Sequence, residues 1–380
     1  MSSIPYVKKK IGDSYLIWFQ NSNQYIQFKE PAWFVFRKTV NRSNTKTIAH
    51  EFATRYGIAA DKSLLFVMDV QTEIDKLNHE HDQIHTENYT TEINQHIYTP
   101  FSIHRYKLGN HVIAFAYENQ IFENYIHPLI CHFEVEEEAE ENYLFELFAF
   151  KSQIAFRFNH EGKGLWNRDE THLVKGLIYM YLINVMHDKT DEDWLMTIHA
   201  SAITNNKKTI LFSAAPGNGK TTIASLLQTR GYQLISDDFV PINKDTFSAY
   251  PFPIAISVKQ GSVDLLSSVY PDLENKRLNY INPEKSVRYQ APNHHFDITK
   301  SIYPVREFIF VEYNPDVDFK LEKLDPIMAF KLLLDQVFVY QNKENVMSLF
   351  NHLLNISFYQ LTYSNNQKAL DAIAELFEGK

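Results

Sequence analysis

The segment Thr209-Ile210-Leu211-Phe212-Ser213-Ala214-Ala215-Pro216-Gly217-Asn218-Gly219-Lys220-Thr221-Thr222 is the most informative part of this 380-residue chain. Its apolar beginning is typical of a buried strand, and small turn-forming residues then lead into the start of a helix. A phosphate-binding loop of the Walker A type requires this order of strand, loop and helix. The sequence therefore predicts a nucleotide site in an α/β domain.

The residue types in this loop suit a triphosphate. Gly217 and Gly219 lack Cβ atoms, so the backbone can turn tightly and point its N–H groups at phosphate oxygens. Lys220 would reach the β- and γ-phosphates, and the Thr221 hydroxyl would ligate Mg²⁺. We therefore expect ATP and Mg²⁺ as cofactors. The expected nucleotide-binding residues are Ala214, Ala215, Pro216, Gly217, Asn218, Gly219, Lys220, Thr221 and Thr222.

Ala214 departs from the strict loop pattern, which has glycine at its position. Alanine fits there if its φ angle stays negative. The alternative to a nucleotide site is a glycine-rich turn that merely precedes an ordinary amphipathic helix.

Composition narrows the class of protein. The chain is 44% hydrophobic and long enough for two domains, each with its own core. A net charge of −9 argues against a nucleic-acid partner, and the chain contains no apolar run of about 18 residues that would indicate a membrane partner. Cys131 is the single cysteine, so no intrachain disulfide forms and a cytoplasmic location is expected. The oligomeric state, including a homo-oligomer, stays open.

Residues 1–80 are predicted to form a small α+β domain. Residues 15–19 and 25–28 are two strand-like runs joined by a polar turn that together predict a hairpin, and periodic helical patterns follow at residues 32–40 and 45–56 and from Asp61. The apolar stripe expected on the third helix consists of Leu64, Leu65, Met68, Ile74 and Leu77. This arrangement resembles PqqD-like domains, which bind leader segments of modified peptides. The resemblance implies a peptide groove between strand 25–28 and helix 64–75. A winged-helix-like accessory lobe that only packs on the main domain is the alternative.

Residues 81–100 are predicted to be a polar linker. With the preceding His79 and Glu80, this stretch brings together His81, Asp82 and His85, a spacing that could gather a metal ion. No fixed helical register or cysteine partner supports such a site, so a solvated linker is the favoured interpretation. Strands are predicted at residues 112–117, 125–135, 143–150 and 153–158.

Two carboxylates follow the phosphate-loop region. Residues 195–203 lead through a polar turn into the loop strand, which would place His199 on a strand beside the loop. After the loop helix, a strand at residues 232–235 ends in Asp237 and Asp238. Paired carboxylates beside a phosphate loop suit Mg²⁺ binding and proton transfer. The alternatives are a turn or helix cap for the aspartates and a packed strand histidine for His199.

His199, the loop through Lys220 and Thr221, and the pair Asp237-Asp238 occur in the order and spacing of the HPr kinase/phosphorylase catalytic domain. The chain thus resembles the wider group of HPr-kinase-related proteins, often found near peptide-modification genes. The resemblance implies that residues 101–380 form a P-loop kinase domain, a mixed sheet with flanking helices. It also implies that Asp237 takes the proton of a serine hydroxyl, that Asp238 and Thr221 hold Mg²⁺, and that His199 tunes the base.

The resemblance predicts an ATP- and Mg²⁺-dependent serine kinase acting on a peptide or protein substrate. Thr222 stands where the family has a glutamate, which makes reversal by phosphorolysis doubtful, and residues 325–380 are longer and differently patterned from the family's tail. Lys259, Lys285 and Arg288 are further candidates for binding phosphate, and ordinary surface positions are the alternative. Two other functions stay open: a nucleotide-gated peptide-binding module without phosphotransfer, and a small-molecule kinase.

Overall fold

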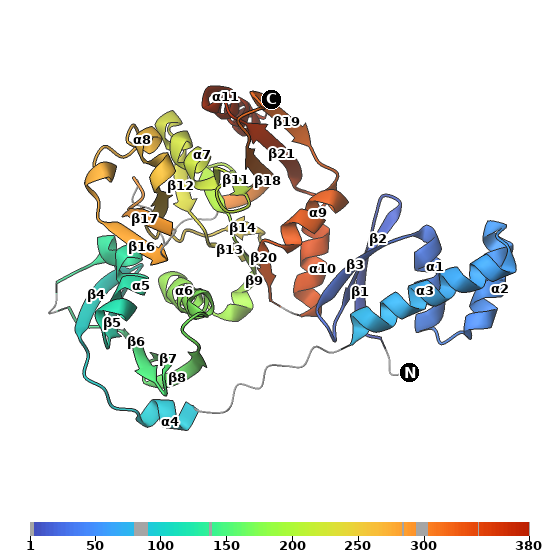
Figure 1. Ribbon diagram of the computed structural model, residues 1–380, viewed down its shortest axis with the longest axis horizontal. Coiled ribbons are helices and arrows are strands. Elements are labelled where there is room, and N and C mark those ends of the chain that lie inside the picture. The colour runs from blue at the N-terminus through green and yellow to red at the C-terminus, as the bar shows by residue number, and fades with distance from the viewer. Residues whose placement is uncertain are drawn as a thin grey trace. The chain divides into compact units, whose positions relative to one another are not determined.

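The structure, a computed structural model, describes residues 4–79, 90–136, 139–282, 285–293, 303–340 and 342–379 (Figure 1). It is a mixed α/β chain with several sheets, which confirms the predicted α/β class. Contacts divide the chain into two units. Unit 1 combines Met1–Ile84 with Asp325–Lys331 and Val339–Asn355, and unit 2 contains the rest. No helix among the described residues is both long and apolar enough to cross a bilayer.

Unit 1 begins with an antiparallel sheet followed by three helices. The sheet has the order β1-β2-β3, and its strands and the helices that follow are β1 (Tyr6–Ile11), β2 (Ser14–Phe19), β3 (Gln24–Lys29), α1 (Glu30–Val40), α2 (Thr45–Tyr56) and α3 (Ala60–Asn78). The predicted hairpin and helices are confirmed, with β1 as an additional strand. Gly57 ends α2 with a φ of 65°, a conformation that glycine adopts without steric cost.

The apolar stripe expected on α3 is partly wrong. Leu65 and Met68 are 63% and 50% exposed, whereas Val67 and Ile74 are fully buried. Ile74 packs in a cluster with β2, β3 and α1, and Val67 packs in a second cluster with α1 and α2. A periodic pattern thus located the helix but assigned too many residues to its buried face.

A late segment of the chain completes unit 1. It contains the first part of α9 (Pro326–Leu334) and all of α10 (Lys343–His352). The ammonium of Lys9 donates a hydrogen bond to Asn351 Oδ1 over 2.7 Å. The Tyr25 ring on β3 lies 5.6 Å and 6.2 Å, centroid to centroid, from the rings of Phe330 and Phe350. These aromatic contacts bury side chains from both ends of the sequence in one unit.

Unit 2 contains a five-stranded sheet in the order β4-β5-β6-β7-β8, whose strands are Ser102–Leu108, His111–Tyr117, Tyr143–Phe150, Gln153–Phe158 and Glu161–Trp166. Helix α4 (Thr90–Gln95) packs beside β8 with Ile93 buried, so part of the predicted linker is a helix. The remaining linker residues up to 89, including His81, Asp82 and His85, lie outside the described residues.

The strand predicted at residues 125–135 is wrong. Helix α5 (Gln120–Ile130) occupies most of this stretch, followed by a 3₁₀ turn at Cys131–Phe133. Asn119 starts the helix, because its side chain accepts hydrogen bonds from the backbone N–H groups of Ile121 and Phe122. This cap outweighs the strand preference of the aromatic and branched residues that follow it.

Among the described residues, the second sheet of unit 2 has ten strands. Eight follow the order β12-β10-β11-β18-β14-β13-β9-β20, and β21 pairs with both β18 and β19. Their bounds are β9 (Trp194–Ile198), β10 (Ser201–Thr204), β11 (Thr209–Ser213), β12 (Gln233–Ser236), β13 (Val240–Asn243), β14 (Ser248–Ala249), β18 (Tyr303–Tyr313), β19 (Phe319–Lys323), β20 (Val337–Val339) and β21 (Ser357–Tyr363). Residues 195–203 were predicted to form one strand that pairs with the loop strand. Only β10 from this stretch pairs with β11, because β9 pairs with β13 instead.

The helices of unit 2 and a small third sheet complete the fold. They are α6 (Thr171–His187), α7 (Lys220–Leu227), α8 (Val263–Leu266), α11 (Asn366–Glu378) and the sheet β15-β17-β16 (Ile256–Lys259, Lys285–Gln290, Leu278–Asn282). Helix α7 contacts β10, β11 and β12, and Ile223 and Leu227 are fully buried in a core shared with β18, β21 and α11. This packing fixes the start of α7 at the end of β11 (Figure 1).

Candidate functional site

The predicted loop joins β11 to α7 in the conformation that the two glycines were expected to provide. Gly217 and Gly219 have φ angles of 97° and 87°, in the region that favours glycine. Ala214 is absent from the residues with positive φ, so alanine fits at that position as expected. No side chain caps the first turn of α7, because its N-cap residue is Gly219. The N–H groups of that turn therefore remain available to a ligand.

A side chain from a strand that is distant in the sequence lies against Gly219. A Cβ atom on this residue would lie 2.8 Å from the hydroxyl oxygen of Tyr363, which belongs to β21. Contacts this short do not occur between real Cβ atoms and oxygen, so any other residue would displace the loop or the tyrosine.

A cavity of about 390 Å³ opens in front of the loop. Its volume lies within the usual range for small-molecule sites. Residues from α6, the third sheet and the loop region line it, including Lys175, Tyr179, Ala214, Ala215, Pro216, Gly217, Gly219, Lys220, Thr221, Thr222, Asp238, Lys259, Ser262 and Tyr289. Of the loop residues that were predicted to bind nucleotide, all except Asn218 line this cavity.

Lys220, Asp238 and His199 form a chain of polar contacts at the cavity wall. The Lys220 ammonium is 2.5 Å from Asp238 Oδ1, and His199 Nε2 is 3.1 Å from the same oxygen. Partial desolvation opposes ionisation of Asp238, whose side chain is 52% exposed, but Lys220 and the hydrogen bond from His199 together outweigh it and hold the pKa of this carboxyl below its usual range. His199 lies in a bend between β9 and β10, not on a strand as predicted.

Asp238 has an unusual backbone conformation. Its φ angle is 72°, which costs energy for any residue with a Cβ atom but is tolerated best by asparagine and aspartate. Such strain persists where the surrounding structure maintains it, which is frequent at functional sites. In this chain, the conformation directs the Asp238 carboxylate into the cavity, opposite Lys220.

Asp237 lies differently, although it is the adjacent residue. It is 4% exposed, and it does not line the cavity. Its carboxylate accepts hydrogen bonds from the hydroxyls of Ser201 and Thr221, the latter over 3.1 Å. Burial raises the pKa of Asp237, with Lys220 acting against that effect and Asp238 adding to it. The two aspartates are therefore distinguished by position and by ionisation.

Replacing Asp237 with asparagine is expected to stabilise the ligand-free protein near pH 7. Because the pKa of Asp237 is raised on folding, its stability contribution is complete below the ordinary value of 3.8 and is lost as pH rises through the raised value. Asparagine retains an oxygen that accepts from Ser201 and Thr221 but carries no charge. Urea denaturation should show a higher free energy of unfolding for Asp237→Asn at pH 7, with the gain shrinking at pH 4.

Asp238→Asn is the matched control for this experiment. Its pKa is lowered on folding, so its stabilising contribution is present at pH 7 and is lost as pH falls. The variant should be less stable than the natural chain at pH 7. If Asp237→Asn destabilised the protein as much as Asp238→Asn at pH 7, the inferred cost of ionising Asp237 would be contradicted.

Several cavity residues were missed by sequence reasoning. Lys175 and Tyr179 are one helical turn apart on α6, and Tyr289 comes from β17. Burial and the nearby Asp238 raise the pKa of Tyr289 to about 12, so it offers a neutral hydroxyl. Only the four-residue spacing of Lys175 and Tyr179 was visible in the sequence, and nothing in it indicated which face the cavity would meet.

The three cations predicted to bind phosphate have different outcomes. Lys259 lines the cavity, and its ammonium lies 4.0 Å from the position of a Cβ on Gly217. Arg288 instead donates a hydrogen bond to the side chain of Gln260 and is not among the lining residues. The side chain of Lys285 lies outside the described part of the structure.

Comparisons with known proteins add little. No family model matches the chain, and no curated protein matches it. Among solved structures, the HPr(Ser) kinase/phosphatase from Coxiella burnetii matches with a TM-score of 0.20 and 12% sequence identity. The match covers 48% of this chain and 87% of that one. A TM-score this low does not establish a common fold.

Proposed function

We propose that the protein is an ATP- and Mg²⁺-dependent kinase that phosphorylates a serine hydroxyl on a peptide or protein. The observation that carries this proposal is the meeting of Lys220 and Asp238 in one cavity with the glycine turn. A cation that binds phosphate and a carboxylate that accepts a proton are the two side chains that phosphoryl transfer to a hydroxyl requires.

The residues of the site fit a nucleotide and a metal ion. The uncapped start of α7 offers N–H groups to phosphate oxygens, and Lys220, 8% exposed, adds a positive charge with little competing water. Thr221 would ligate Mg²⁺, with Asp237 behind it accepting the hydrogen bond from its hydroxyl. Bound Mg²⁺ would neutralise charge that develops on the transferred phosphoryl group.

The geometry supports roles for the two aspartates that reverse those implied by the family resemblance. Asp238 faces the cavity and would accept the proton of the serine hydroxyl, whereas buried Asp237 would orient Thr221 and the metal. In the ligand-free protein Lys220 lowers the pKa of Asp238. Once Lys220 turns toward phosphate, Asp238 loses that cation and becomes a stronger base. His199 would keep the carboxylate oriented.

The first experiment is direct detection of phosphotransfer. The full chain would be incubated with ATP, Mg²⁺ and a degenerate peptide library that has a fixed central serine, and mass spectrometry would identify phosphoserine. We expect phosphopeptides that are absent without Mg²⁺ and absent with Lys220→Ala. ADP formation without any phosphorylated peptide would favour a different acceptor, and free L-serine would be assayed in parallel as a small-molecule substrate.

Unit 1 is proposed to present the peptide. Strand β3 is an edge of its sheet in the described residues, and an extended peptide would add to such an edge through backbone hydrogen bonds. A charge introduced there, Gln27→Lys or Gln27→Glu, is expected to lower kcat/KM for the peptide by about tenfold, equivalent to roughly 1.4 kcal/mol. Asp13→Lys, an exposed change in the turn between β1 and β2, is the control.

The same variants separate the proposed function from its alternatives. A small-molecule kinase would show no loss with either Gln27 variant, because it needs no peptide edge. A nucleotide-gated binding module would bind peptide in response to ATP but would never form phosphoserine, even with the natural residues at Lys220 and Asp238.

A further inference from the structure

A second group of chemically active side chains lies away from the loop cavity, on three elements of unit 2. His104 and Tyr106 are two residues apart on β4, and side chains with that spacing share one face of a strand. Glu123 and His127 are four residues apart on α5, so they are neighbours on one helix face. Glu134 directly follows the 3₁₀ turn after α5, where a β-bridge joins it to Tyr106.

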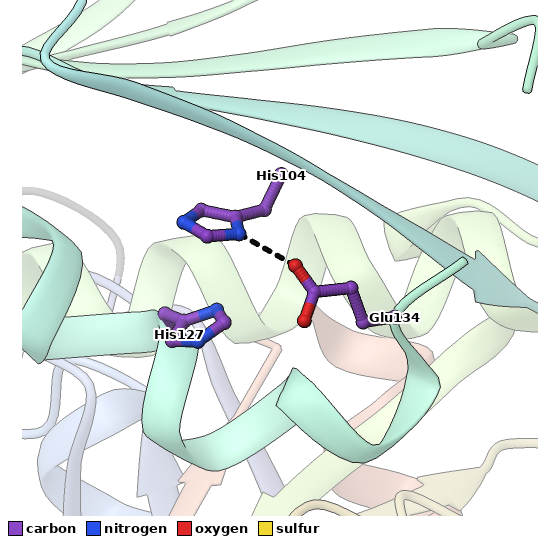
Figure 2. A group of neighbouring side chains, drawn as sticks. All are labelled: His104, His127 and Glu134. Atoms are coloured by element: carbon purple, nitrogen blue, oxygen red, sulfur yellow. Dashed lines mark hydrogen bonds and ion pairs between the residues drawn. The ribbon is translucent and has the colours of Figure 1, made fainter. Parts of the chain in front are cut away.

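Three of these side chains converge on one point. Figure 2 shows the rings of His104 and His127 beside each other, with the Glu134 carboxylate turned toward them. One ring nitrogen from each histidine and one oxygen of Glu134 all lie within 4.8 Å of one another. The two rings are 4.2 Å apart between centroids, and His104 Nδ1 is 2.6 Å from Glu134 Oε1.

The remaining two side chains each contact a nitrogen of one of the two rings. His104 Nε2 lies 2.6 Å from Glu123 Oε1, and His127 Nδ1 lies 2.8 Å from the hydroxyl oxygen of Tyr106. If His104 Nε2 and His127 Nδ1 donate their protons outward, loss of the proton that His104 Nδ1 shares with Glu134 leaves lone pairs on His104 Nδ1 and His127 Nε2 for a metal ion. Metal-binding histidines are generally oriented by a carboxylate or another acceptor in this manner.

We propose that His104, His127 and Glu134 bind a Zn²⁺ ion, with Glu123 and Tyr106 orienting the two imidazoles. Two imidazoles and one carboxylate form a donor set suited to zinc, and they leave a fourth position for water. Magnesium prefers oxygen ligands only, so this site is chemically distinct from the one proposed at Thr221.

The geometry requires only small movements to accept the ion. Two ligands at the usual zinc bond lengths are roughly 3.3 Å apart in a tetrahedral site. His104 Nδ1 and Glu134 Oε1, now 2.6 Å apart, would separate slightly, and a His127 nitrogen already lies within 4.8 Å of both ligand atoms. The side chains of His104 and Glu134 are 22% and 42% exposed, so zinc has a path from solvent.

Zinc alone is the probe for this site. Full-length protein freed of metal by a chelator would be titrated with ZnCl₂ by calorimetry, and bound zinc would be measured after dialysis. We expect one zinc ion fewer per chain in His127→Ala than in the natural protein. His160→Ala, a change to an exposed histidine outside the cluster, is the control and should bind as the natural chain does.

Two conservative variants separate metal binding from folding. Glu123→Gln and Tyr106→Phe keep the shapes of their side chains but alter the outer hydrogen bonds, and each is expected to weaken zinc binding by about 10–100-fold. Co²⁺ loaded in place of zinc should give absorption bands that disappear in His127→Ala. If the natural chain and His127→Ala took up the same amount of zinc with the same affinity, the proposed site would be refuted.

Discussion

Asp238→Asn should slow phosphoryl transfer by about 10²–10⁴-fold, the usual contribution of a positioned general base. The amide cannot accept the proton of the acceptor hydroxyl, although it occupies the same place in the cavity. Nucleotide binding should not weaken, since Lys220 loses a competing carboxylate 2.5 Å away. The fold should be retained, because asparagine tolerates the φ of 72° at this position as well as aspartate does.

Single-turnover measurements with saturating ATP would report the transfer step, and calorimetry with a non-hydrolysable ATP analogue would report binding. Asp237→Asn is the matched comparison at the neighbouring position. It is expected to raise the Mg²⁺ concentration needed for half-maximal activity, because Asp237 contacts Thr221 and not the cavity. If Asp238→Asn kept full turnover while Asp237→Asn lost it at every Mg²⁺ concentration, the roles implied by the family resemblance would be favoured over those proposed.

Gly219→Ala should lower the affinity for ATP by roughly 10²–10³-fold, from the combined costs of backbone strain and overpacking. The φ of 87° is unfavourable for alanine, and the added methyl group would lie 2.8 Å from the Tyr363 hydroxyl oxygen. The loop would have to move, and the N–H groups that it shares with α7 would no longer point at the phosphates.

Gly231→Ala is a control with almost the same backbone conformation. Its φ is 83°, yet no atom lies within 4 Å of the position of an added Cβ. It should lose about 1–2 kcal/mol of stability through strain alone and keep its affinity for ATP. Adding Tyr363→Phe to Gly219→Ala should restore part of the affinity, because the nearest remaining atoms are 3.7 Å away. Equal losses of affinity in Gly219→Ala and Gly231→Ala would contradict a specific role for the loop.

The loop and the paired aspartates could be predicted because their chemistry depends on residues that are close together in the sequence. Glycines at positive φ, the lysine at a helix start and the acids at a strand end are local patterns. The sequence could not predict that Tyr363 packs against Gly219, because that contact requires β21 to pair in parallel with β18, and β18 in parallel with β11.

Local sequence patterns also could not show which of the two adjacent aspartates faces the cavity. Whether Asp237 or Asp238 faces the cavity depends on the positive φ at Asp238 and on Ser201 reaching across from β10. The cluster of His104 and His127 was missed for a related reason. The stretch that contains His127 was interpreted as a strand. Residues four apart, such as Glu123 and His127, are neighbours on a helix but lie about 13 Å apart along a strand.

Unit 1 is built from separate stretches of sequence, and this limits how it can be produced as an isolated fragment. Cutting the gene after residue 84 would release the three strands and three helices without α10, which would remove the ring that covers Tyr25 on β3 and the hydrogen-bond acceptor of Lys9. Such a fragment should aggregate rather than report on ligand recognition. An excision that keeps unit 1 whole would splice residues 325–331 and 339–355 onto the fragment, so that all three stretches of chain stay together.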